Sequence, residues 1–172
     1  GDDGIVRLYQ FPSGELIYEL PGQTNWVRKI IFSHDGKLIA CSTEDGKVQV
    51  WSLEKRERLN LFDEHDGRVW EIAFAPDGET IVSGSDDQQI KLWNLAANRC
   101  ITTLKGYTCK LRAVAFSPDG RWIATGSKDK TICLFALDDP EYQEHPSSPL
   151  VAPEGHDGWV RCLIFHPTEP IL

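Results

Sequence analysis

Two sets of aromatic residues recur along the chain at a fixed interval of 42 residues. In the first set, Phe32, Phe74 and Phe116 begin the similar runs FSHDGKLIACS, FAPDGETIVSG and FSPDGRWIATG. Phe165 begins a fourth run, FHPTEPIL, after a longer interval of 49 residues. In the second set, the runs DGIVRLY, DGKVQVW, DQQIKLW and DKTICLF end at Tyr9, Trp51, Trp93 and Phe135. Because two independent markers keep one period, the chain is predicted to be an array of repeated supersecondary units.

Each unit has the pattern of four short β-strands. The first strand is predicted to end at the phenylalanine, where a His-Asp-Gly or Pro-Asp-Gly turn leads into the second strand. The second strand is a run such as TIVSGS or WIATGS, the third a run such as QIKLW, and the fourth RCITTL or ELIYEL. No stretch shows sustained helical periodicity. Four strands in about 40 residues are typical of a propeller blade, so we predict an all-β fold of four-stranded antiparallel blades.

The repeats resemble those of the WD-repeat β-propeller family, and the resemblance covers nearly the whole chain. The tryptophans that end the third strands are followed by Ser52 and Asn94, so the Trp-Asp pair of the family name is absent. The repeats are similar in style to arrays of bacterial, especially cyanobacterial, multidomain proteins. The resemblance implies a half blade at residues 1–20, blades at 21–62, 63–104 and 105–153, and a second half blade at 154–172.

These four blade equivalents are fewer than the roughly seven blades that the resemblance implies for a propeller. The chain is therefore expected to be a fragment of a longer protein. A compact ring of four blades and an eight-bladed ring of two chains are the alternatives. Open blades expose strand edges and apolar faces, which favours association between molecules.

The longer interval before Phe165 places seven extra residues around the run DDPEYQEHPSSP, between a third and a fourth strand. Its prolines predict an extended loop. The loop is interpreted either as solvated and without a special role or as a docking loop around Tyr142 or Ser147–Pro149.

In the family, a buried hydrogen-bonded set of His, Ser or Thr, Asp and Trp holds each blade together. One blade here matches the set fully, with His65, Ser83, Asp87 and Trp93. The other sets depart from it and are expected to be weaker or rebuilt. They comprise Gln23, Cys41, Asp45 and Trp51, then Tyr107, Thr125, Asp129 and Phe135, and lastly His156, which begins a further set. A Ser/His/Asp trio also suggests catalysis, but its repeat-fixed positions and the lack of a GxSxG motif favour a structural role.

The composition and motifs favour a non-catalytic protein. Acidic residues outnumber basic ones by 26 to 18, for a net charge of -8, which argues against a general nucleic-acid binder. No run approaches the length of a membrane span. Five cysteines without close pairs are interpreted as reduced thiols in the cytoplasm and not as disulfides or a zinc site. No GxxxxGK[ST], HExxH or DxDxDG motif occurs, so no cofactor, metal site or enzymatic activity is predicted.

The strand that begins each unit is irregular. Apolar residues stand three and then two positions apart, as in Val69, Ile72 and Phe74, and the same spacing recurs in every repeat. One extra residue of this kind indicates a β-bulge, which re-aims side chains at the rim of a sheet. Members of the family contact partners through residues around this bulge and through the residue before the turn aspartate. The matching positions here are Trp26, Arg28, Arg68, Trp70, Lys110, Arg112, Trp159 and Arg161, with Asp2, Glu44, Asp86 and Lys128 before the aspartates.

In an acidic chain these positions form a local basic and aromatic arc, and Arg and Trp are common in binding hot spots. We predict an interaction scaffold or sensor that binds an acidic or phosphorylated protein or peptide on this face, by Arg contacts and stacking. The same residues are alternatively read as structural, with the cations paired to Glu44, Asp86 and Glu71 and the tryptophans half buried. The alternative functions are a nucleic-acid-associated propeller that places the arc on phosphates and, last, an enzyme with a site in the central channel.

Overall fold

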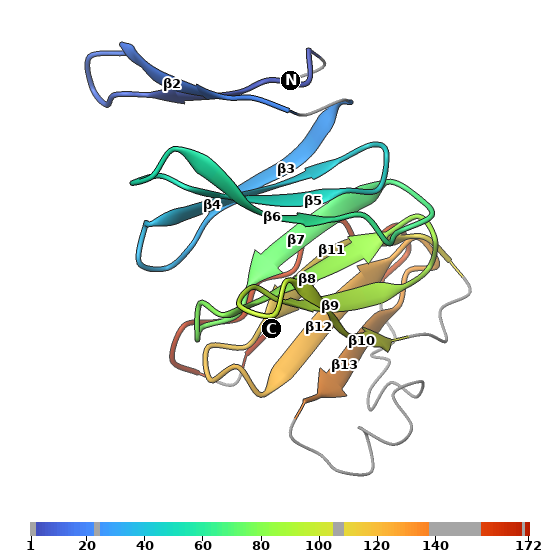
Figure 1. Cartoon of the computed structure of the whole chain (residues 1–172). Coiled ribbons are helices and arrows are strands. Elements are labelled where there is room, and N and C mark those ends of the chain that lie inside the picture. The colour runs from blue at the N-terminus through green and yellow to red at the C-terminus, as the bar shows by residue number, and fades with distance from the viewer. Residues whose placement is uncertain (1–2, 23–24, 105–108, 138–155, 170) are drawn as a thin grey trace.

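The computed structural model describes residues 3–22, 25–104, 109–137, 156–169 and 171–172, which contain strands and no helix (Figure 1). All strand pairs are antiparallel, and consecutive strands pair within each sheet. The prediction of an all-β fold with four-stranded antiparallel sheets is therefore confirmed. By sheet, the strands are β1 (Val6–Tyr9) and β2 (Leu16–Leu20); β3 (Val27–Phe32), β4 (Leu38–Thr43), β5 (Val48–Ser52) and β6 (Glu57–Phe62); β7 (Val69–Phe74), β8 (Thr80–Ser85), β9 (Ile90–Asn94) and β10 (Arg99–Leu104); and β11 (Leu111–Phe116), β12 (Trp122–Ser127) and β13 (Ile132–Ala136).

The turn after each first strand repeats the same local chemistry. Gly36, Gly78 and Gly120 have φ angles of 69°, 71° and 71°, in the left-handed region that glycine adopts at little cost. The aspartate before each glycine accepts a backbone hydrogen bond from the residue that follows the glycine, as Asp119 does from Arg121 at 3.1 Å. These short turns fix the pairing of β3 with β4, β7 with β8 and β11 with β12.

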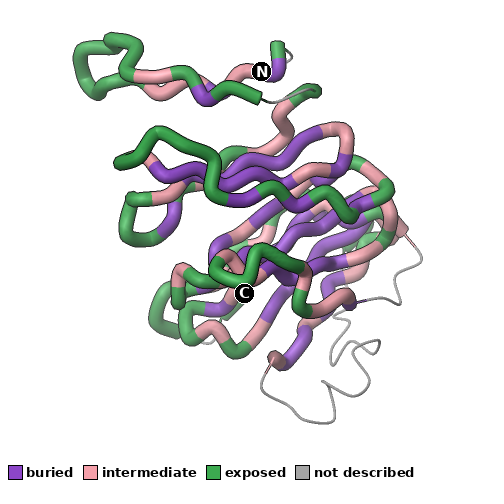
Figure 2. Tube along the Cα trace, viewed as in Figure 1, coloured by how far each residue is buried: buried purple, intermediate pink, exposed green. Residues whose placement is uncertain are grey.

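The hydrophobic core lies between neighbouring sheets. Three clusters of buried side chains join the first sheet to the second, the second to the third and the third to the fourth. Burial is greatest along the middle strands of the sheets, as Figure 2 shows. The Trp93 ring on β9 is stacked on Phe62 of the preceding sheet, with the ring centres 4.8 Å apart. Each sheet thus stabilises its neighbours, as expected for stacked repeats.

The sheets follow one another in chain order across the molecule, with β1 and β2 at one end (Figure 1). Residues from His156 onward run beside β11 and β12 at the other end, where the Val160 amide donates to the Ser127 carbonyl at 3.1 Å. Among the described residues, no strand pairing joins β1 or β2 to the segment from His156 onward.

The half blade expected at residues 154–172 stays a prediction, and the described part of that segment is irregular. No strand is assigned there, although the His166 amide donates to the Ile171 carbonyl at 2.8 Å. A single such bond does not give the ladder of hydrogen bonds that defines a strand pair. The proline-rich run, with Tyr142 and Ser147–Pro149, lies outside the described residues, as does the fourth strand expected before residue 153.

Candidate interaction surface

The predicted bulges are present in all three complete first strands. The pairing register shifts between Val27 and Lys29, between Val69 and Glu71, and between Leu111 and Ala113. The extra residues at these shifts are Arg28, Trp70 and Arg112. Because a bulge turns its extra side chain away from the regular alternation, these three residues are directed to the end of the sheets where β3, β7 and β11 begin. We call this end of the molecule the bulge face.

The turn between the second and third strands of each sheet is tied to the bulge face by a repeated backbone bond. Glu44 donates its amide to the Trp26 carbonyl at 2.9 Å, and Asp86 donates to Arg68 at 2.9 Å. The amide of Lys128 donates in the same way to the Lys110 carbonyl at 3.1 Å. The residue before each turn aspartate is therefore held beside the start of the first strand. Asp2, the fourth residue expected at this position, lies outside the described residues.

Cations and indole rings alternate across the bulge face, from one sheet to the next. The guanidinium carbon of Arg28 lies 5.1 Å from the centre of the Trp26 ring and 4.8 Å from that of Trp70. The guanidinium carbon of Arg112 lies 4.1 Å from the centre of the same Trp70 ring. Contacts of this kind are attractive because the face of an indole ring carries negative charge. We call these four residues the Arg–Trp stack.

Two carboxylates neutralise part of the positive charge. Glu44 forms ion pairs with Arg28 of its own sheet and with Arg68 of the next sheet, the latter at 2.5 Å. The pair with Arg68 joins two adjacent sheets at the bulge face. The alternative in which the cations pair with the acidic residues is thus realised for part of the arc.

Asp86 is the most highly connected acid on the bulge face. It accepts from the Trp70 indole at 2.9 Å, from Arg112 at 2.7 Å and from Lys110 at 3.3 Å. Burial by itself would raise the pKa of Asp86, but the hydrogen bonds and charges of Arg112 and Lys110 outweigh it and lower the pKa below its usual value. Asp86 is therefore ionised at neutral pH and joins its own sheet to the following one.

Exposure divides the arc into two parts. The side chains of Arg112 and Asp86 are each 9% exposed, so their charges interact with each other and with neighbouring side chains more than with solvent. Arg68 and Lys110 are 50% and 49% exposed, and Trp159 is 51% exposed. Arg161 is exposed and Lys128 is half-buried. We call Arg68, Lys110, Lys128 and Arg161 the basic rim, because their charges face solvent at least in part.

The last part of the arc contains cations without an acidic partner. The Lys128 amine lies 4.1 Å from the centre of the Trp159 ring, and the Arg161 guanidinium lies 5.2 Å from it. Neither cation forms an ion pair with a carboxylate of any described residue. Desolvation and repulsion from Arg112, Lys110 and Arg161 lower the pKa of Lys128 below its usual value. The positive charge is therefore least compensated at this end.

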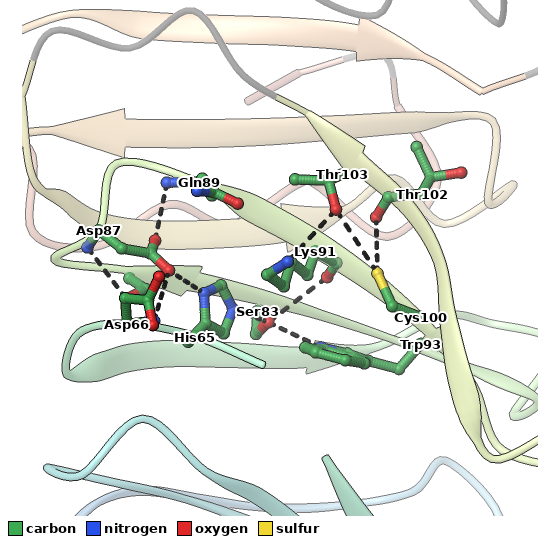
Figure 3. Close-up of polar contacts among 11 residues, drawn as sticks. His65, Asp66, Ser83, Asp87, Gln89, Lys91, Trp93, Cys100, Thr102 and Thr103 are labelled. Carbon is green, nitrogen blue, oxygen red and sulfur yellow. Dashed lines mark hydrogen bonds and ion pairs between the residues drawn. The ribbon is translucent and has the colours of Figure 1, made fainter. Parts of the chain in front are cut away.

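The complete His/Ser/Asp/Trp set forms one chain of hydrogen bonds in the sheet of β7–β10 (Figure 3). His65 Nδ1 lies 2.7 Å from Asp87 Oδ2, and His65 Nε2 lies 2.7 Å from Ser83 Oγ. The Trp93 indole donates to the same hydroxyl oxygen at 2.8 Å. Each donor in this chain has one acceptor when His65 is neutral, with its proton on Nδ1. These three contacts join the four residues that the sequence assigns to the set.

This arrangement has the connectivity of a catalytic triad but lacks access to solvent. Ser83 and the side chain of His65 are fully buried, and the serine oxygen already accepts from the Trp93 indole. A nucleophilic hydroxyl must be accessible to the substrate. The Ser83 hydroxyl is not accessible, because Ser83 is fully buried. Burial would raise the pKa of Asp87, but the hydrogen bond and electrostatic interaction with His65 lower it. The polar groups of the set are therefore used in contacts within the sheet.

The other sets differ from the complete one at the position of the donating tryptophan or of its acceptor. In the sheet of β3–β6, the buried Trp51 indole nitrogen has no hydrogen-bond partner among the described residues, and Cys41 stands where the complete set has a serine. Asp45 is instead paired with Lys47 at 2.9 Å. Loss of the hydroxyl acceptor therefore leaves a buried donor unsatisfied in this sheet.

In the sheet of β11–β13, Thr125 donates weakly to the Cys133 carbonyl at 3.5 Å, and Asp129 accepts from the Thr131 amide at 3.1 Å. Phe135 replaces the tryptophan and has no polar atom to donate. His156 is exposed and has no hydrogen-bond partner among the described residues. Gln23 and Tyr107 lie outside the described residues.

Several contacts between sheets were not predicted from the sequence. Lys29 on β3 forms an ion pair with Glu71 on β7 at 2.9 Å, and desolvation raises the pKa of Glu71 above its usual value despite that partner. Asn60 on β6 donates to the Leu95 carbonyl of the next sheet at 2.8 Å. The ion pair between Lys29 and Glu71 could have been inferred from their separation of 42 residues, because residues one period apart take the same position on neighbouring sheets.

Two absences hold for the described part of the chain. No group of three or more His, Cys, Asp or Glu side chains there is arranged to hold a metal ion. Likewise, none of its elements is a helix long and apolar enough to cross a membrane.

Comparison with known proteins agrees with the repeat structure. The family model described as "WD domain, G-beta repeat" matches residues 14–52, 56–94 and 98–135. The chain is 39% identical over 51 residues to the Lissencephaly-1 homolog of Caenorhabditis briggsae, which covers 30% of this chain and 13% of that protein. It is 30% identical over 66 residues to the Angio-associated migratory cell protein of Homo sapiens, covering 38% of this chain and 15% of that protein.

A third relative, the Ubiquitin homeostasis protein lub1 of Schizosaccharomyces pombe, is 36% identical over 50 residues, covering 29% of this chain and 7% of that protein. The matches to these three relatives therefore span only a small part of each protein's length. The three segments matched by the family model, in contrast, cover more than half of the 172 residues. Together with the bulged first strands and the buried hydrogen-bonded set, they show that the chain belongs to the WD-repeat family.

Proposed function

We propose that this chain is a non-catalytic protein-interaction platform that binds an acidic or phosphorylated protein segment on the bulge face. WD repeats support protein interaction at the level of the family. The observation that carries the proposal is the excess of positive charge among the described residues of the arc, in a chain that is acidic as a whole. These arc residues comprise two carboxylates, Glu44 and Asp86, and six cations, namely Arg28, Arg68, Lys110, Arg112, Lys128 and Arg161.

The two parts of the arc have different roles in this proposal. The Arg–Trp stack is rigid because each guanidinium is held by a carboxylate and an indole ring at once. The basic rim is exposed and supplies the contacts to the partner. A rigid support lowers the entropic cost of ordering the binding groups, so affinity improves without additional contacts.

The absence of catalysis is proposed on a separate ground. The one Ser/His/Asp arrangement among the described residues is buried and saturated with hydrogen bonds within the blade. Other hydroxyl groups of the described residues, such as those of Ser33 and Ser117, contact a turn aspartate without a histidine. A protein whose polar residues at one face are mainly cations and indoles is better suited to recognise a charged surface than to transform a substrate.

Binding of a fluorescent peptide of alternating Glu and Gly residues, followed by anisotropy at several salt concentrations, tests the proposal. The double substitution Arg68→Glu with Lys110→Glu removes two exposed cations and is expected to weaken binding by about tenfold or more. The matched control, Lys37→Glu with Lys55→Glu, makes the same charge change at the opposite end of the strands, where both lysines are exposed. We expect it to change the affinity by less than about twofold.

Equal weakening by the two double variants would refute a specific binding face. The nucleic-acid alternative is tested in the same assay with single-stranded DNA of equal length. Binding of the DNA that is tighter than that of the peptide, with a steep decrease as salt increases, would replace the proposal by that alternative. A peptide that does not bind the unmodified chain at low salt would also overturn it.

A further inference from the structure

One equivalent position on the bulge face changes from an acidic to a basic residue between the repeats. Glu44, Asp86 and Lys128 are 42 residues apart, and each precedes the turn aspartate of its sheet. Their amides make the same bond to the strand start, at 2.9, 2.9 and 3.1 Å. The backbone is thus equivalent in all three repeats, and only the side chain changes from an anion to a cation.

In the first two repeats, the anion at this position binds side chains from the following sheet. Glu44 pairs with Arg68, and Asp86 pairs with both Lys110 and Arg112. Removing either carboxylate would leave cations of two adjacent sheets close together without compensation. Such like-charge contacts are unfavourable where the groups are partly desolvated.

In the third repeat, that unfavourable arrangement is the observed one. Lys128 and Arg161 both face the Trp159 ring, at 4.1 and 5.2 Å from its centre. The backbone holds the two cations together, because Val160 donates to the Ser127 carbonyl at 3.1 Å. Lys110 is bonded through its carbonyl to the Lys128 amide. The lowered pKa of Lys128 agrees with this crowding of positive charge.

We propose that a phosphoryl group of a phosphorylated protein segment occupies the place that the Glu44 and Asp86 carboxylates hold in the other repeats, bound by Lys110, Lys128 and Arg161 and bordered by Trp159. This inference rests on the proposed function and names the ligand of one part of the bulge face. The chemistry of the partner is a phosphoserine or phosphothreonine in an extended stretch of chain.

A phosphoryl group fits this position better than a carboxylate does. One carboxylate balances one charge, whereas a phosphoserine carries a charge of roughly -1.5 to -2 at neutral pH and three acceptor oxygens. Three cations with separate donors match three oxygens, and the guanidinium of Arg161 offers paired donors to two of them. The Trp159 ring, 51% exposed, provides a flat apolar surface for the residue next to the phosphate.

The substitution Lys128→Asp tests the inference, because it restores the anion found in the other two repeats. The new carboxylate is expected to pair with Arg161, so the fold and the midpoint of thermal unfolding are retained or improved. Binding is measured by anisotropy with three labelled ten-residue peptides of Gly and Ala that differ only at the central residue, which is phosphoserine, glutamate or serine. We expect the phosphoserine peptide to bind the unmodified chain at least about tenfold more tightly than the glutamate peptide.

Lys128→Asp is expected to weaken binding of the phosphoserine peptide by about tenfold or more. The matched control is Lys130→Asp, which makes the same charge change on the same turn. Lys130 is exposed and has a φ angle of 77°, which aspartate tolerates better than most residues. This control is expected to change the affinity by less than about twofold.

Failure of this inference is distinguishable from failure of the proposed function. Equal binding of the phosphoserine and glutamate peptides, or equal loss with Lys128→Asp and Lys130→Asp, would overturn the phosphoryl site and leave a general acidic partner in place. If neither these peptides nor the Glu-Gly peptide bound at low salt, the proposed function would be refuted as well. Tighter binding of a single-stranded DNA than of the phosphoserine peptide would assign the site to a nucleic-acid phosphate and overturn the inference.

Discussion

Replacing Ser83 by alanine is the most direct test of how the β7–β10 sheet is held together. The Ser83 hydroxyl lies 2.7 Å from His65 Nε2 and accepts from the Trp93 indole at 2.8 Å. Both partners are buried, and Trp93 is fully so. Ser83→Ala therefore leaves two buried polar groups without a partner and makes no space large enough for a compensating water.

The cost follows from these two orphaned groups. A buried polar group that loses its partner costs about 1–3 kcal/mol, so for two such groups we expect Ser83→Ala to lower the free energy of unfolding by roughly 2–6 kcal/mol. In a chain of this size, each kcal/mol corresponds to about 2–4 °C in the midpoint of thermal unfolding. The variant is therefore expected to unfold roughly 4–24 °C below the unmodified chain.

The assay is urea unfolding followed by tryptophan fluorescence and by far-ultraviolet circular dichroism. The control is Ser42→Ala, because Ser42 is equally buried but its hydroxyl has no hydrogen-bond partner among the described residues. We expect this control to lie within about 0.5 kcal/mol of the unmodified chain. If Ser83→Ala and Ser42→Ala destabilise the chain equally, the hydrogen-bonded set does not hold the blade and the reasoning is refuted.

Three further predictions concern the other repeats, pH and the two parts of the arc. Cys41→Ser places a hydroxyl opposite the unpaired Trp51 indole and is expected to raise the free energy of unfolding by about 0.5–1 kcal/mol in the same urea assay; a loss would contradict it. The pKa of Asp87 is lowered in the folded state, so the stability that its ionised form contributes is present above the usual aspartate pKa and is lost as pH falls through the folded value. We therefore expect Asp87→Asn to flatten the acid part of the profile of unfolding free energy against pH. An unchanged slope would count against this. Arg112→Met, at a 9% exposed site, is expected to lower the free energy of unfolding by about 1–3 kcal/mol, measured by calorimetry. Arg68→Met, at a 50% exposed site, is expected to lower it by less than about 0.5 kcal/mol. Equal losses would remove the distinction between the Arg–Trp stack and the basic rim.

Much of the fold was predictable because it depends on local signals. The runs TIVSGS and WIATGS are the strands β8 and β12, and RCITTL is β10. The Asp-Gly turns and the alternation of apolar residues involve residues only a few positions apart, so they can be recognised within one repeat, and they recur in the others. The positions of the bulges could be predicted as well, because the spacing of three and then two between apolar residues is also local.

The arc was only partly predictable. Arg68 and Arg112 belong to successive repeats, two positions apart in the repeat, and carry the same charge. The Arg68 side chain is nevertheless half exposed, whereas that of Arg112 is 9% exposed. Sequence spacing does not show that Trp70 lies between two guanidinium groups or that Asp86 binds three side chains at once. These contacts depend on how closely one sheet packs on the next.

The chain by itself determined the period, the strands, the turns and the identity of the buried set, since each arises from residues close in sequence or equal in repeat position. The tertiary structure alone decided which charges are used inside the protein and which face solvent. The reason is physical: ion pairing and burial depend on distances between residues such as Asp86 and Arg112, which are 26 positions apart and are brought to 2.7 Å only when adjacent sheets pack together.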